Sequence, residues 1–168
     1  MSLPIIILVF YAALYDIKYS KIPNYLVLSI VVIGTIQLTY NSDITSSISA
    51  APIFFAISGI FVGLSICIIL FYIGLFGAGD AKLLASLGIF FGPSNIIILI
   101  AVAVGFAGLL SLSRLSCYGE LTPMLSRWCQ SIKLGCYLKP EANTTASSAV
   151  PMGGAILLAT VFCEFYLF

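Results

Sequence analysis

The sequence predicts an all-α integral membrane protein, a polytopic bundle of about six transmembrane helices. Of its 168 residues, 61% are hydrophobic and only 8% are charged, which is far from the balance of a soluble globular domain. The polar residues gather in breaks between long apolar stretches, and the spacing of these breaks predicts the helices. We expect a single compact domain over residues 1–168.

A membrane-spanning helix needs about 20 mostly apolar residues, and six stretches are candidates. In chain order they cover residues 3–15, 25–40, 51–76, 81–91, 96–112 and 151–168. The third stretch is long enough to cross a bilayer with a tilt. Gly92 and Pro93 separate the fourth stretch from the fifth, because a Gly-Pro pair marks a sharp helical break. Pro151 suits the first turn of the sixth helix.

The basic residues test this topology, because Lys and Arg collect in short cytoplasmic loops. Lys18 and Lys21 lie between the first two stretches, and Lys82 lies between the third and fourth. The other four basic residues lie between the fifth and sixth stretches, at positions 114, 127, 133 and 139. All of them fall on one side of the predicted bundle. We therefore expect a multi-pass protein with Asp16 and Asp80 near the cytoplasmic face.

Residues 113–149 form the one sizeable polar segment of the sequence. Apolar residues recur among its basic residues with a spacing that suggests a short amphipathic helix on the membrane surface: Leu115, Leu121, Leu125, Trp128, Ile132 and Leu134. We expect a cytoplasmic or interfacial loop that anchors the chain to the bilayer. A role in gating access of a substrate is the alternative.

Two of the six acidic residues, Asp16 and Asp80, lie where an apolar stretch meets a polar loop. Both stretches are short for a span, so the carboxyl groups are expected below the headgroups, where ionisable groups indicate function. A carboxylate pair can hydrolyse a peptide bond: one takes a proton from water while the other, protonated, polarises the scissile carbonyl. The helix dipole favours charge on Asp80, but either assignment stays open. The simpler alternatives are an interfacial Asp16 and a helix-capping Asp80.

Five further residues are expected to shape the loops or bind substrate: Pro23, Asn24, Gly77, Gly79 and Lys82. The two glycines precede a helix and leave the backbone free, so that an extended chain can approach Asp80 closely. The Pro-Asn pair ends the loop after Asp16 and sets where the second helix begins. The lysine holds a substrate carboxylate or tunes the aspartates, unless it is an ordinary cytoplasmic anchor.

The composition also excludes several classes of function. The net charge is +1 and there is no histidine, so the chain has neither the basic surface that nucleic acids require nor an imidazole for catalysis or metal binding. The five cysteines contain no CxxC pair, so no zinc or redox motif is present. We expect no nucleic-acid partner, no metal and no cofactor.

These residues resemble the type IV prepilin peptidase family, whose members are intramembrane aspartic proteases of the Gly-x-Gly-Asp type. Members carry one aspartate before a loop that ends in Ile-Pro-Asn, and a second in Gly-x-Gly-Asp-x-Lys-Leu. Both motifs are present here, at residues 16–24 and 77–83. Residues 150–153 also resemble the proline and glycine segment that opens the family's last helix. The chain is similar to small peptidase-only members of tight-adherence (Flp) pilus systems, or to archaeal preflagellin peptidases.

The resemblance implies that Asp16, Asp80 and water remove a basic leader peptide from prepilins or pseudopilins at the cytoplasmic face of the bacterial inner membrane. Larger members also methylate the new amino terminus with an added domain that carries CxxC pairs, and we do not expect this activity here. The competing class is a transporter, channel or pilus assembly factor whose aspartates bind ions or protons. Against that class, the acids cluster at one face and no repeat is visible. The oligomeric state is left open.

Overall fold

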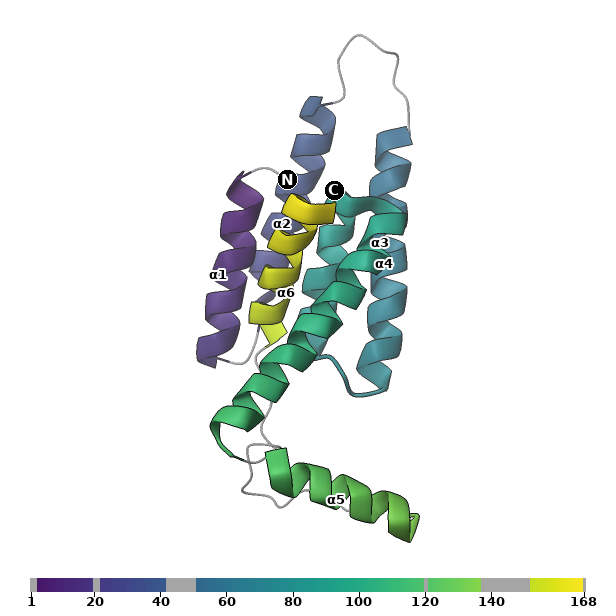
Figure 1. Ribbon diagram of the computed structural model, residues 1–168. Helices are drawn as coiled ribbons and strands as arrows, with labels where there is room; N and C mark the ends of the chain where they lie inside the picture. Colours follow the sequence, from purple (N-terminus) through teal and green to yellow (C-terminus); the bar gives the residue numbers. More distant parts are fainter. Residues whose placement is uncertain (1–2, 20–21, 42–50, 120, 137–151, 168) are drawn as a thin grey trace. The chain divides into compact units, whose positions relative to one another are not determined.

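The computed structural model describes residues 3–19, 22–41, 51–119, 121–136 and 152–167, and Figure 1 shows its helices. These helices are α1 (Leu3–Tyr19), α2 (Asn24–Asn41), α3 (Ala51–Tyr72), α4 (Ala78–Cys117), α5 (Leu121–Leu134) and α6 (Met152–Phe162), which continues as the π-helical turn η2 (Cys163–Leu167). No strand occurs in the described ranges. The predicted all-α class is confirmed.

The long helix α4 contains the fourth and fifth predicted helices, joined across a break at Gly92. This glycine has φ 70° and ψ −180°, a conformation that residues with a Cβ rarely adopt. A Cβ there would also overlap the ring of Phe55 in α3. Pro93 then opens the second part of α4, where its missing N–H is tolerated. The predicted break is confirmed, although the two helices adjoin directly, whereas the predicted stretches left residues 92–95 between them.

Several helix ends differ from the predicted ones, among them the end of α4 at Cys117 and not at residue 112, and two of these differences bear on the aspartates. α1 continues past residue 15 to Tyr19, so Asp16 lies within the helix. α4 begins at Ala78 and not at residue 81, so Asp80 lies in its first turn. α3 ends at Tyr72, because Gly74 adopts a left-handed φ of 84° and turns the chain before residue 76.

The first part of α4 is the central helix of the bundle, and all residues from 83 to 89 are buried. A helix that is apolar on every side packs against neighbours all round, and here small residues permit the close approach. Gly59 of α3 and Gly88 of α4 touch through their backbones, since a Cβ on either would overlap the carbonyl of the other. Gly34 of α2 similarly makes room for the ring of Phe90.

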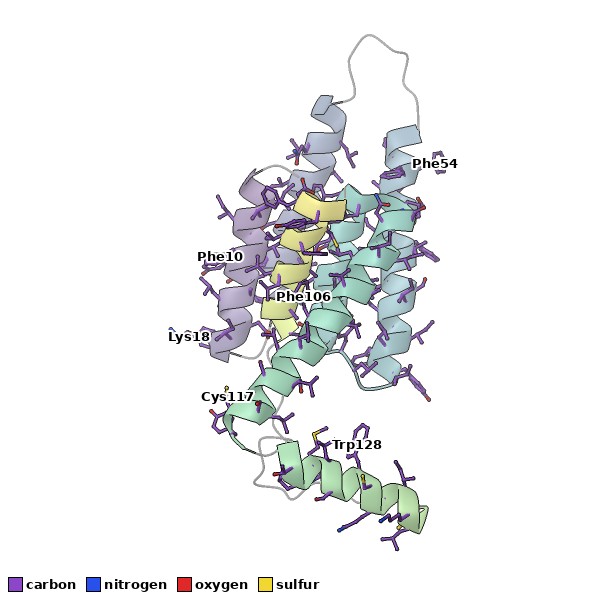
Figure 2. The ribbon with its side chains drawn as sticks, viewed as in Figure 1. Phe10, Lys18, Phe54, Phe106, Cys117 and Trp128 are labelled. Carbon is purple, nitrogen blue, oxygen red and sulfur yellow. The ribbon has the colours of Figure 1, made fainter. Side chains whose placement is uncertain are left out.

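Among the described residues, two helices are long and apolar enough to cross a membrane, α3 over Ile53–Tyr72 and α4 over Ala78–Cys117. The described residues also contain shorter apolar helices over Asn24–Leu38 and Met152–Tyr166. Large apolar side chains cover the outer surface, and Figure 2 shows Phe10 and Phe54 pointing away from the helices. Such a surface indicates insertion in a membrane. The expected number of six spans stays a prediction.

The chain forms two compact units. Unit 1 comprises Met1–Phe106 and Pro151–Phe168, and unit 2 comprises Ala107–Val150. In unit 1, α6 lies along α1 (Figure 1) and also meets α4, where the rings of Phe106 and Phe162 make an edge contact with centroids 5.8 Å apart.

Unit 2 contains the end of α4 and the helix α5, so the amphipathic helix expected within residues 113–149 is present as α5. Some residues used in the sequence predictions lie outside the described ranges: Lys21, residue 120 and residues 137–151.

Candidate active site

Asp16 lies near the end of α1 and is buried, with 6% of its surface exposed. Its Oδ2 accepts a hydrogen bond of 2.8 Å from the backbone N–H of Gly153, in the first turn of α6. A Cβ at Gly153 would lie 2.9 Å from Cβ of Asp16 and 3.0 Å from Cα of Ala13. The glycine therefore lets the start of α6 approach α1 closely enough for its N–H to reach the carboxylate.

Asp80 lies in the first turn of α4 and is also buried, with 8% of its surface exposed. Its Oδ2 accepts a hydrogen bond of 3.3 Å from the N–H of Gly77, the residue before the helix. This bond is half of a capping box. Oδ2 of Asp80 therefore caps α4, which is the simpler role considered from the sequence. Oδ1 is buried and has no hydrogen-bond partner among the described residues. Buried polar atoms are normally paired, so this oxygen is available to a group that enters the site.

The two aspartates lie close enough for the charge of Asp16 to act on Asp80. The reason is topological: α1 ends, and α2, α4 and α6 begin, at the same end of unit 1 (Figure 1). Figure 2 labels Lys18, two residues after Asp16, at this end of α1. The structure thus brings together the two carboxyl groups that the sequence singled out, from helices far apart in the chain.

A hydrogen bond between side chains ties the first residue of α2 to α4. α2 begins at Asn24, as predicted from the Pro-Asn pair, and the carbonyl of Pro23 accepts a bond of 3.1 Å from the N–H of Leu26. Oδ1 of Asn24 accepts a bond of 3.2 Å from Nζ of Lys82. Lys82 therefore links the two sequence motifs, and its expected roles toward a substrate or the aspartates stay predictions.

The glycines before Asp80 differ from the expectation drawn from the sequence. Gly79 lies within the first turn of α4, and neither it nor Gly77 has a left-handed φ. A Cβ at Gly79 would lie 3.2 Å from Cβ of Ile22, so the loop before α2 packs against this glycine, and the expected approach of an extended substrate stays a prediction. Packing between two segments explains this glycine better than freedom of its backbone.

Gly153 and Ile22 are the site residues that sequence reasoning missed. Residues 150–153 were noticed as a family-like segment, but only the neighbouring α1 reveals what the glycine does. Within the described ranges, no three His, Cys, Asp or Glu side chains gather where they could hold a metal ion. The expected independence from metal and cofactor stays a prediction.

Comparison with known families adds an independent finding. Residues 3–112 match the type IV leader peptidase family, over well more than half of the chain, and the chain belongs to this family. The match includes both aspartates and ends before α5 and α6. No curated protein and no solved structure matched the chain. The family predicted from the motifs is confirmed, and with it a leader-peptidase type of protease.

Proposed function

We propose that the chain is an intramembrane aspartic endopeptidase that removes the leader peptide of type IV prepilins or pseudopilins of the Flp type. The observation that carries this proposal is the pair of buried carboxyl groups, Asp16 and Asp80, at one end of the helical bundle. Membership of the leader peptidase family supports a prepilin-type substrate. The predicted topology puts the reaction at the cytoplasmic face of the bacterial inner membrane.

In the proposed mechanism Asp16 is the ionised base. The short hydrogen bond from Gly153 comes from the amino-terminal turn of α6, and both the bond and the helix dipole favour a negative charge. Asp80 is the acid: Oδ2 receives the longer bond from Gly77, and Oδ1 carries the proton. This assignment is opposite to the one that the dipole of α4 alone favours, because α6 brings a second helix start to Asp16.

The reaction then follows in two steps. Asp16 takes a proton from water as the water oxygen bonds to the scissile carbonyl carbon, and Asp80 gives its proton to the carbonyl oxygen. Asp16 next gives its proton to the leaving nitrogen, Asp80 takes one from a hydroxyl of the tetrahedral intermediate, and the C–N bond breaks. Both carboxyl groups return to their starting states. One shared proton is favoured throughout, because two neighbouring carboxylates repel each other.

We further propose that the bundle crosses the membrane six times, with α1, α2, α3, the two parts of α4 and α6 as spans. The length and composition of α3 and α4, the apolar helices α2 and α6 and the exposed aromatic side chains support insertion. Asp16 and Asp80 would then meet a substrate at the membrane surface, where a leader joins the apolar helix of a pilin. The expected lack of methyltransferase activity stays a prediction.

The test is cleavage of a co-expressed prepilin from the same genome by the native chain and by Asp16→Asn and Asp80→Asn. Ser86→Ala is a matched control, since Ser86 is a buried polar residue of α4 whose hydroxyl bonds to the carbonyl of Leu83 in its own helix. We expect the native chain and the control to shorten the prepilin, and both Asn variants to leave it intact at equal membrane levels.

Two outcomes would contradict the proposal in different ways. Cleavage by a well-inserted Asn variant would show that the dyad is not the catalytic group, although the chain is still a peptidase. If the native chain leaves every candidate prepilin intact, the alternative of a transporter, channel or assembly factor becomes the better explanation. Proton or cation flux through reconstituted protein, abolished by the same Asn variants, would then support that class.

A further inference from the structure

The helix α5 has an apolar face that is open to its surroundings. Leu125, Trp128 and Ile132 follow one another at intervals of three and four residues, so they share one side of the helix. Their exposed fractions are 61%, 58% and 79%, which is high for such large apolar side chains. Figure 2 shows Trp128 projecting from α5. We call these three residues the α5 apolar face.

Outside the α5 apolar face, every charge that α5 carries is positive. Arg127 and Lys133 lie outside the apolar face, on its two flanks at about 100° per residue. The helix contains no Asp or Glu. A helix with basic and polar residues opposite an apolar face that includes Trp suits the boundary between acyl chains and anionic headgroups. The positive charge favours an anionic partner, and the exposed apolar face that includes Trp128 favours a lipid surface as that partner.

Connectivity within unit 2 keeps α5 near the end of α4. α4 ends at Cys117 and α5 begins at Leu121, so the connection spans at most about 14 Å when fully extended. α4 is long and apolar enough to cross a membrane. If its last turn reaches the bilayer surface, the first residue of α5 is within reach of the headgroups.

We propose that α5 lies in the plane of the cytoplasmic leaflet, with the α5 apolar face among the acyl chains and Arg127 and Lys133 at anionic headgroups. This inference rests on α4 spanning the membrane and not on catalysis by the aspartates. The binding of α5 to the bilayer surface then depends on the content of anionic lipid in that surface. Each basic side chain near an anionic surface favours the bound state by about fivefold.

Trp128 makes the proposal directly measurable, because it is the only tryptophan in the chain. The full chain is reconstituted in nanodiscs of phosphatidylcholine with phosphatidylglycerol, and in discs of phosphatidylcholine alone. Some acyl chains carry bromine, which quenches indole fluorescence on contact. In anionic discs we expect about twofold or greater quenching and protection from aqueous acrylamide, as for an indole about 5–10 Å into the bilayer boundary. Quenching should be weaker in discs of phosphatidylcholine alone.

Charge variants separate the electrostatic contribution from the apolar one. Arg127→Gln with Lys133→Gln should lower quenching in anionic discs to the level seen in neutral discs. Lys18→Gln is the matched control, since it removes one positive charge from the exposed end of α1, and it should leave quenching unchanged. Cleavage of a prepilin is not the readout, so failure of the proposed peptidase activity would not affect the result.

Three results would overturn the inference. Quenching of Trp128 by acrylamide but not by brominated lipid in both kinds of disc would mean that the face is in water. Protection from both quenchers would mean that protein covers it. Equal quenching by lipid in anionic and neutral discs, unchanged in the double variant, would rule out recognition of anionic lipid.

Discussion

Gly153 and Gly154 are neighbours in α6 but face different surroundings. A Cβ at Gly153 would press on Asp16 and Ala13 of α1, whereas a Cβ at Gly154 would meet nothing within 4 Å. The bond from Gly153 to Asp16 therefore depends on the absence of a side chain at a single position. Alanine at either position changes the helical propensity of α6 in the same way, but only alanine at Gly153 disturbs the position of the Asp16 carboxylate.

We predict that Gly153→Ala lowers prepilin cleavage by about a hundredfold, because α6 must move by a fraction of an ångström to an ångström and shift the N–H that holds Asp16. Gly154→Ala, which adds the same methyl group, should retain activity within about twofold, since its Cβ meets nothing within 4 Å and changes away from close contacts have little effect. The measurement is the fraction of prepilin shortened at equal enzyme levels in membranes. Equal activity of the two variants would show that Gly153 does not position Asp16.

Sequence reasoning at the residue scale found the carboxyl groups but not their partners. Asp16 and Asp80 stand out because acids are rare in this chain and both lie beside apolar stretches. Their hydrogen-bond donors are backbone N–H groups of glycines, and every residue except proline has one. Only the neighbouring helices decide which of these donors reaches an acid.

At the scale of elements, the crossing of α3 and α4 depends on direct contact between backbones. Gly59 and Gly88 face each other with no room for a Cβ on either, in the part of α4 where all residues from 83 to 89 are buried. This contact fixes the lateral position of the helix whose first turn carries Asp80. Damage to it should therefore affect stability first and cleavage as a consequence.

We predict that Gly88→Ala destabilises the protein by about 1–3 kcal/mol, the usual effect of overpacking, and lowers the unfolding temperature in detergent by several degrees. Gly105→Ala is the matched control in the same helix, because a Cβ there meets nothing within 4 Å. It should be neutral or stabilise by up to about 1 kcal/mol, since alanine is the better helix former. If Gly105→Ala unfolds at as low a temperature as Gly88→Ala, the contact between α3 and α4 does not explain the loss of stability.

Helix periods and breaks predicted the elements well, and the errors are local. The break at Gly92 was visible because Gly-Pro is incompatible with a continuous helix, and α5 was visible from its spacing of apolar residues. The extensions of α1 and α4 toward the aspartates were missed. From the sequence, Lys18 and Gly79 were interpreted as loop residues. In the structure, packing of α6 on α1 favours the helical state at Lys18, and packing of Ile22 on Gly79 favours it at Gly79.

On the scale of the whole molecule, the five native cysteines can be labelled to test the membrane topology, with no cysteine added. Cys117, Cys129 and Cys136 are exposed in unit 2, and Cys67 and Cys163 are buried in unit 1. All three exposed thiols lie within or beside the segment predicted to face the cytoplasm. A membrane-impermeant maleimide should therefore distinguish the two sides of the membrane.

We predict labelling of the three exposed cysteines in inverted vesicles and none in intact spheroplasts, with the two buried cysteines reacting only after denaturation. Peptide mass mapping identifies each modified thiol. A variant with serine at the three exposed positions is the control and should remain unlabelled in both preparations. Labelling of Cys129 from outside the spheroplasts would invert the predicted topology and place the aspartates on the opposite face.

The sequence by itself determined the helical class, the family, the two aspartates and the amphipathic α5, because each depends on composition or on short-range periodicity. The tertiary structure decided what these parts do to one another. It brought the start of α6 to Asp16, left one oxygen of Asp80 without a described partner, and filled the space beside Gly79 with Ile22. The physical reason is range: periodicity reports how a segment faces an apolar environment, whereas contacts between helices depend on which small residues let distant backbones meet.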